Sequence, residues 1–144
     1  MHLRRIAQER ANLENDPLPT CSAHLINDED LYHWAATISG PSISPYADQN
    51  FELKVLLPDN YPHNAPKIFF ITSIFHPNVS CTGEVKMGDL EPDQWCPALT
   101  ISKLLISVQA LLSDANLADG CVVNEEAASL YLKDIDEFRR RVRF

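Results

Sequence analysis

Residues 75–90 read F-H-P-N-V-S-C-T-G-E-V-K-M-G-D-L and lie between two parts of the chain with different patterns. Upstream, Y-P-H-N-A-P at 61–66 leads into an apolar run at 68–71. Downstream, Q-W-C-P-A-L-T-I-S-K at 94–103 leads into a strongly periodic helix. Between residues 77 and 100 no helical or strand period is sustained. A long irregular segment inside a compact domain usually has a functional role, so we expect the site there.

Four stretches before this segment predict β-strands, at residues 21–25, 31–39, 51–57 and 67–71. In the second and third, apolar and polar residues alternate, as they do in a strand that buries one face. The connections between the four stretches are short. Because parallel neighbours need long crossover connections, short ones favour an antiparallel meander.

Helical signals occupy the two ends of the chain. Helical spacing predicts a first helix over residues 1–14, which Asp16-Pro17 ends. Thr100 can cap the central helix, whose apolar residues form one stripe. Asn124 can cap another helix, and Asp134, with a glutamate three residues later, matches a capping box for the last one.

The predicted fold class is therefore α+β, in a single domain over residues 1–144. Its elements are an N-terminal helix, a four-stranded antiparallel meander sheet, an irregular active-site segment, a central helix and C-terminal helices. The four cysteines are far apart and form no C-x-x-C pair, which predicts free thiols and no zinc site. No metal or other cofactor is expected.

Charge and hydropathy restrict the partners and the location. The formal net charge of −8 argues against nucleic-acid binding and matches an anionic membrane surface poorly. No run approaches the roughly 20 apolar residues of a membrane span, and the first residues lack the apolar region of a secretory signal. We expect a cytoplasmic or nuclear protein with neither nucleic acid nor membrane as a partner.

The H-P-N triplet at 76–78, with Y-P-x-x-x-P before it and Q-W-x-P-A-L-T-I after it, resembles the catalytic domain of ubiquitin-conjugating (E2) enzymes. The resemblance covers nearly the whole chain, from D-P-x-x-x-C-S-A at 16–23 to the C-terminal helices. It implies the UBC fold of that family, whose architecture is the one that the strand and helix patterns predict. It also implies an acyl transferase of the ubiquitin-like (Ubl) conjugation pathway.

The resemblance implies roles for three residues of the site. In this family the eighth residue after the H-P-N asparagine is the cysteine that carries ubiquitin as a thioester, and that position is Lys86 here. Asn78 would either stabilise the oxyanion or order a nearby loop, and Asp119 would lie near the incoming lysine. Gly120-Cys121 departs from the Pro-Leu that usually follows that acidic residue. We expect His76 to be a structural hydrogen bonder rather than a general base.

Lys86 leaves open whether the protein is an enzyme, because a lysine cannot form a thioester and the product of its acylation would be a stable amide. The leading hypothesis is a natural E2 variant, a pseudoenzyme that binds pathway proteins without conjugating, and the off-pattern residues 87–89 favour it. An alternative is an active E2 whose cysteine was engineered to lysine as an isopeptide trap. Another is a nucleophile relocated to Cys81 or Cys96.

The resemblance also implies the partners: ubiquitin or a ubiquitin-like protein, the E1 activating enzyme, an E3 ligase and in some cases another E2. Arg4 and Arg5 would dock on E1, unless they form only a solvated basic face. The residues expected at the E3-binding face are Tyr61, Pro62, His63, Trp95, Cys96, Pro97 and Ala98. His63 replaces a large apolar residue of the family, which predicts weaker E3 binding.

Overall fold

The computed structural model describes residues 2–118 and 120–142. Its elements are α1 (His2–Asn15), β1 (Cys21–Asn27), β2 (Asp30–Ser39), β3 (Asn50–Leu56), β4 (Lys67–Phe70), the 3₁₀ turn η1 (Gly88–Leu90), α2 (Ile101–Ser113), α3 (Glu125–Lys133) and α4 (Ile135–Val142). The predicted α+β class is confirmed. The expected strands are present, with ends that differ from the predicted ones by two residues or fewer.

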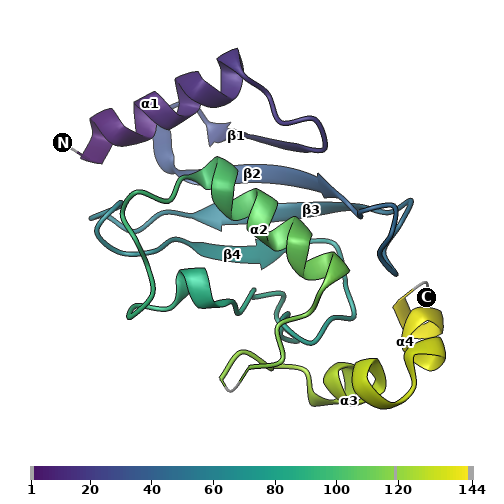
Figure 1. Ribbon diagram of the computed structural model, residues 1–144. Helices are drawn as coiled ribbons and strands as arrows, with labels where there is room; N and C mark the ends of the chain where they lie inside the picture. Colours follow the sequence, from purple (N-terminus) through teal and green to yellow (C-terminus); the bar gives the residue numbers. More distant parts are fainter. Residues whose placement is uncertain (1, 119, 143–144) are drawn as a thin grey trace.

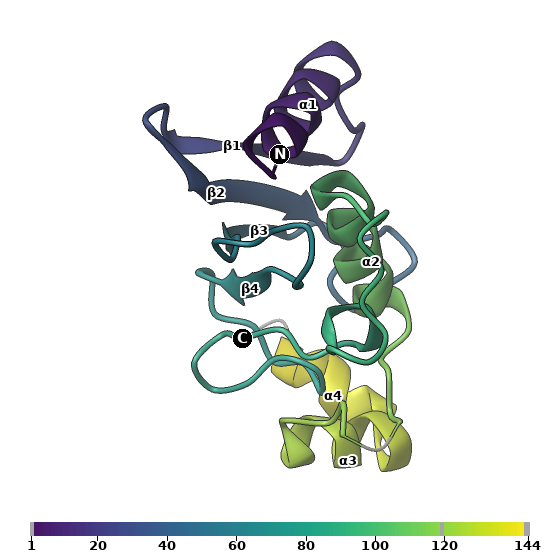
Figure 2. The same cartoon turned by 90° about the vertical axis from the view of Figure 1, so that its left-hand side faces the viewer.

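The four strands form one antiparallel sheet in the order β1-β2-β3-β4. Figure 1 shows α2 lying across one face of this sheet, with α1 beside β1. Figure 2 shows α3 and α4 beyond the β4 end. The connections are short and the strand order is sequential, so the predicted meander is confirmed.

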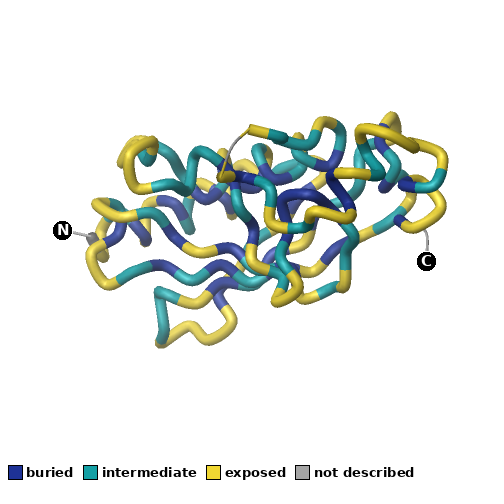
Figure 3. The backbone as a smooth tube through the Cα atoms, turned by 90° about the horizontal axis from the view of Figure 1, so that it is seen from below, coloured by how far each residue is buried: buried dark blue, intermediate teal, exposed yellow. Residues whose placement is uncertain are grey.

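The register of the sheet places apolar residues of neighbouring strands on the same face. Trp34 lies opposite Leu25 on β1 and Val55 on β3, and all three are buried. Residues of the other face, such as Ser22 and Glu52, are exposed. Figure 3 shows buried stretches through the middle of the molecule and exposed stretches in the loops at its rim. The core therefore lies between the sheet and α2.

Each predicted cap begins its helix. The hydroxyl of Thr100 accepts a hydrogen bond from the Lys103 amide of α2, and the side chain of Asn124 accepts one from the Ala127 amide of α3. The Glu137 amide donates to the Asp134 carboxylate at the start of α4, at 3.2 Å. Such caps satisfy amides that have no partner in the first turn of a helix. Within residues 2–118 and 120–142, no helix is both long and apolar enough to cross a bilayer.

A buried carboxylate joins α1 to two distant segments. Glu9 is only 4% exposed, and it accepts hydrogen bonds from Tyr61 Oη at 2.5 Å and from the Ile101 amide at 2.7 Å. The Nε of Arg5 donates to the same carboxylate at 2.9 Å and provides its counter-charge. Buried charges require such pairing and hydrogen bonding. Glu9 thus fixes the 61–63 loop and the start of α2 against α1.

Replacing Glu9 by Ala should lower the free energy of unfolding by about 3–5 kcal/mol, because it leaves the Tyr61 hydroxyl and the Arg5 guanidinium without their acceptor. Urea denaturation measures this change. The matched control is Glu14→Ala, since Glu14 pairs with Arg10 on the surface of the same helix. That change should alter stability by about 0.5 kcal/mol or less. Equal effects of the two variants would contradict the role of Glu9.

Candidate functional site

The irregular segment after β4 folds back on itself and brings Lys86 opposite Asn78. Val79 and Val85 form an isolated antiparallel bridge, and the Lys86 amide donates to the Asn78 carbonyl at 2.8 Å. Gly83 makes the turn with a φ of 92°. A Cβ at this position would lie 2.4 Å from the Phe70 carbonyl oxygen, so both the backbone angle and the space require glycine.

The side chain of Asn78 is fully buried and holds a neighbouring loop. Its Nδ2 donates to the carbonyls of Asn116 at 2.6 Å and Cys121 at 2.9 Å, and its Oδ1 accepts from the Asn116 amide at 2.9 Å. Both amide hydrogens are therefore engaged within the chain. Of the two roles considered for Asn78, this geometry agrees with ordering the loop and leaves no free donor for an oxyanion.

The imidazole of His76 is buried and uses both ring nitrogens. Its Nε2 lies 2.7 Å from the Leu111 carbonyl, and its Nδ1 accepts from the Asn78 amide at 2.9 Å. This pattern corresponds to the neutral tautomer with the proton on Nε2. Burial lowers the pKa of His76 to about 4, and the hydrogen bond to Leu111 opposes this shift. His76 thus has the geometry of a structural hydrogen bonder and no free nitrogen for base catalysis.

Lys86 pairs with a carboxylate that follows η1. Its Nζ lies 2.8 Å from Glu91 Oε1, and the two side chains are 40% and 27% exposed. The hydrogen bond that the Lys86 ammonium donates to Glu91, together with the charge of that carboxylate, raises the pKa of Lys86, and Cys121 and Glu84 add weaker electrostatic contributions. The side chain is consequently an ammonium at neutral pH, which is not a nucleophile. Asp119, expected near the incoming lysine, lies outside the described residues.

A groove of about 410 Å³ has Lys86 in its lining. This lining is partly apolar and comes from residues 64–67 at the start of β4, from residues 84–86 and from residues 90–95 at and after η1. The lining residues are Asn64, Ala65, Pro66, Lys67, Glu84, Val85, Lys86, Leu90, Glu91, Pro92 and Trp95. Within residues 2–118 and 120–142, no cluster of His, Cys, Asp or Glu side chains is arranged to hold a metal ion.

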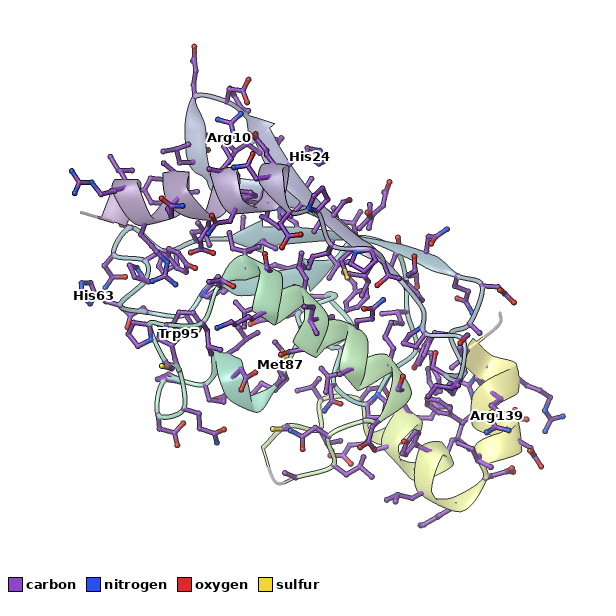
Figure 4. The ribbon with its side chains drawn as sticks, turned by 45° about the horizontal axis from the view of Figure 1, so that its top comes forward. Arg10, His24, His63, Met87, Trp95 and Arg139 are labelled. Atoms are coloured by element: carbon purple, nitrogen blue, oxygen red, sulfur yellow. The ribbon has the colours of Figure 1, made fainter. Side chains whose placement is uncertain are left out.

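The two halves of the predicted E3-binding face lie side by side. Trp95 Nε1 donates to the Pro62 carbonyl at 2.8 Å, and the rings of Trp95 and the buried Tyr61 are 6.2 Å apart. Figure 4 shows His63 projecting outward near Trp95. The exposed residues that continue this face are Cys96, Pro97 and Ala98. This surface lacks a large exposed apolar side chain at position 63.

The two arginines expected at the E1-binding face differ in their surroundings. Arg4 is exposed. Arg5 is partly buried and donates to the Leu99 carbonyl at 2.7 Å, while its guanidinium lies 5.7 Å from the centre of the Tyr61 ring. Together with its ion pair to Glu9, these contacts make Arg5 a structural residue, so that Arg4 is the one available to a partner.

The structure adds Glu91 to the site, and it gives contacts to Cys121, which the sequence indicated only as a departure from the family pattern. Glu91 is five positions after Lys86, and only the folded turn brings the two charges together. Cys121 is buried, its thiol accepts from Asn116 Nδ2 at 3.6 Å, and it interacts electrostatically with Lys86. By contrast Cys81 and Cys96, the thiols considered as relocated nucleophiles, are free and exposed.

Comparison with known families gives one match that spans almost the entire chain. The family described as "Ubiquitin-conjugating enzyme" matches residues 5–144. The matched range contains the whole sheet, the irregular segment with Lys86, and the helices that follow it.

Replacing Asn78 by Ala should destabilise the protein by about 2–4 kcal/mol, since it removes the three hydrogen bonds of a buried side chain. Amide hydrogen exchange should accelerate most at Asn116 and Cys121, whose backbone Asn78 holds. The exposed Asn64→Ala variant is the control and should leave both measurements nearly unchanged. If the Asn78→Ala variant lost stability without faster amide hydrogen exchange at Asn116 and Cys121, Asn78 would not be the residue that holds this loop.

The stability of the protein should decrease between pH 6.5 and pH 4 because of His76. The unfolded imidazole takes up a proton near pH 6.5, whereas the folded one stays neutral down to about pH 4. The stabilisation present above pH 6.5 is therefore lost as the pH falls, by about 3 kcal/mol at the lower end. Urea denaturation at several pH values measures it. A His76→Gln variant should not show this loss of stability between pH 6.5 and pH 4. If the variant and the unchanged protein lose stability equally over this range, His76 is not its cause.

Proposed function

Because the chain belongs to the ubiquitin-conjugating enzyme family, we propose that it is an E2-fold binding protein of the ubiquitin conjugation pathway that has lost the thioester carrier step. The observation that carries this proposal is the ion pair of the Lys86 ammonium with Glu91, at the position that the resemblance assigns to the family's cysteine. An E2 needs a thiolate that accepts the ubiquitin acyl group and then leaves. An ammonium does neither.

The surroundings of Lys86 support natural divergence over a single engineered change. Glu91 provides a carboxylate at hydrogen-bonding distance, and Glu84 adds a second negative charge nearby. Around a cysteine, these carboxylates would disfavour the reactive thiolate, which requires an electropositive setting. The local charges therefore match a lysine better than a cysteine.

The exposure of residues expected to bind pathway partners supports this proposal. Arg4, expected to dock on E1, is exposed, as are His63 and residues 96–98 of the expected E3-binding face. His63 provides no apolar anchor there, so we expect weak E3 binding. The proposed partners are ubiquitin or a ubiquitin-like protein, E1, an E3 and another E2, in the cytoplasm or nucleus.

An active enzyme is the second candidate function, and it is favoured by the exposure of Cys81 and Cys96. In this case one of the two thiols would carry the acyl group in place of residue 86. The two functions differ in whether a covalent, reductant-sensitive adduct forms.

After incubation with E1, ATP and ubiquitin, the intact mass of the protein should remain unchanged with and without reductant. A ubiquitin-sized increase that reductant removes would contradict the loss of the carrier step, and Cys81→Ala and Cys96→Ala variants would locate the thiol. An increase that survives reductant would reveal an amide, with Lys86 as the acceptor. Binding of E1 and ubiquitin, measured separately, should be retained; binding of neither would exclude a pathway role.

Restoring a cysteine should show whether Lys86 alone silences the site. We expect Lys86→Cys to charge slowly, because Glu91 would then lie beside the thiol. The double variant Lys86→Cys/Glu91→Gln should charge about tenfold faster near neutral pH, as a one-unit decrease in the pKa of the introduced thiol would produce. Single-turnover charging assays compare the two variants. Equal rates would show that Glu91 has no influence on a thiol at this position.

A further inference from the structure

A cavity of about 250 Å³ lies where the loop between β2 and β3 meets α4. Its lining residues are Ser42, Ile43, Ser44, Pro45 and Ala47 from the loop, and Arg139 from α4. Figure 4 shows Arg139 at the opposite end of the molecule from His63. The cavity is therefore separate from the expected E3-binding face, and neither Lys86 nor an exposed thiol belongs to its described lining.

The loop that lines this cavity is held by hydrogen bonds and by an aromatic contact with α4. The hydroxyl of Ser44 donates to the Pro41 carbonyl at 2.8 Å and accepts from the Tyr46 amide at 3.2 Å. Tyr46 is buried, and its ring meets that of Phe138 edge to face, with 6.4 Å between the ring centres. The cavity is thus preformed, and a ligand does not have to order it.

Arg139 carries the positive charge of this cavity. Arg140 pairs with Glu137. Arg141 pairs with Glu126 at 2.9 Å. In the part of the chain that the structure describes, Arg139 by contrast is exposed and makes no ion pair. A guanidinium binds a carboxylate through two parallel hydrogen bonds, so Arg139 suits an anionic group of a partner.

Ile43 adds an apolar contact beside this charge. It is 90% exposed, more than any other large apolar side chain of the described residues. The described lining of the cavity contains no carboxylate, so an anion meets no opposing charge there. Protein interfaces combine an apolar centre with arginine side chains. The cavity therefore matches a ligand that has a carboxylate and a large aliphatic side chain on neighbouring residues.

We propose that this cavity binds an acidic linear segment of a partner protein, in which a leucine or another large aliphatic residue stands between carboxylates. Arg139 binds one of the carboxylates, and Ile43 packs against the aliphatic side chain. Charge complementarity favours a peptide over nucleic acid, since nucleic-acid sites contain many cations and this chain has a net charge of −8. The binding does not involve residue 86, so it is independent of whether the carrier step is lost.

The test is a titration of the full chain with a peptide that carries one leucine between pairs of glutamates. Two matched peptides replace the leucine by alanine, or the glutamates by glutamine. NMR chemical shifts follow binding in low salt, where the charges are least screened. The first peptide should bind at least about fivefold more tightly than either matched peptide. Equal affinities, or no detectable binding of the first peptide, would overturn the proposal.

Two pairs of variants test the assigned residues. Arg139→Gln should remove the preference for glutamate over glutamine in the peptide, whereas Lys103→Gln, which removes an exposed cation of α2, should preserve it. Ile43→Ser should remove the preference for leucine over alanine, whereas Ile26→Ser, at an exposed position of β1, should preserve it. A preference that survives in its own variant, or that is lost equally in the control, would overturn the assignment of that residue.

A gain of binding separates this site from a loss of folding. Ser42 is exposed and lines the cavity, so Ser42→Lys adds a second cation there. This variant should bind the leucine and glutamate peptide about threefold more tightly or better, which misfolding cannot produce. Unchanged or weaker binding would overturn the location of the site.

A short single-stranded oligonucleotide tests the other class of anionic ligand. It carries phosphates but no aliphatic side chain for Ile43, so it should bind more weakly than the leucine and glutamate peptide. Tighter binding of the oligonucleotide would overturn the assignment of the cavity to a peptide.

Discussion

Glu9 accepts hydrogen bonds from three segments of the chain, and the arrangement of both predicted partner faces depends on this buried carboxylate. Tyr61 belongs to the loop that carries His63, and Ile101 begins the helix that follows residues 95–98. Arg5 balances the charge and extends the network to the Leu99 carbonyl. A buried carboxylate with these partners permits few alternative positions, because any shift leaves a charge or an amide unsatisfied. The first helix, the 61–63 loop and the start of α2 are thus joined by one buried network.

A second polar network organises the segment that contains position 86. His76 joins α2 to the segment through the Leu111 carbonyl, and Asn78 joins it to the loop at Asn116 and Cys121. Every strong donor and acceptor of the two side chains is used inside the protein. Their contribution is architectural: they hold the backbone at residue 86 in position, whatever side chain is present there.

The sequence was sufficient for the architecture because its signals are local. The alternation around Trp34 and the caps at Thr100 and Asn124 act through residues a few positions apart, and all three occur as predicted. The network of Glu9 could not be predicted, since its partners lie 52 and 92 positions away and a glutamate in an amphipathic helix is usually exposed. The ion pair between Lys86 and Glu91 depends on the turn at η1, and no periodic pattern in the sequence predicts this turn. The site chemistry therefore required the structure, whereas the fold did not.

The two polar networks hold the scaffold without using the side chain at position 86. Lys86 contributes its backbone amide to the Asn78 carbonyl, and its side chain forms an ion pair with Glu91, which is partly exposed. No buried hydrogen bond of the described residues uses the side chain at position 86. A change of residue there costs little stability, because surface ion pairs contribute little. The side chain at position 86 can therefore change its chemistry while the faces held by Glu9 stay as they were.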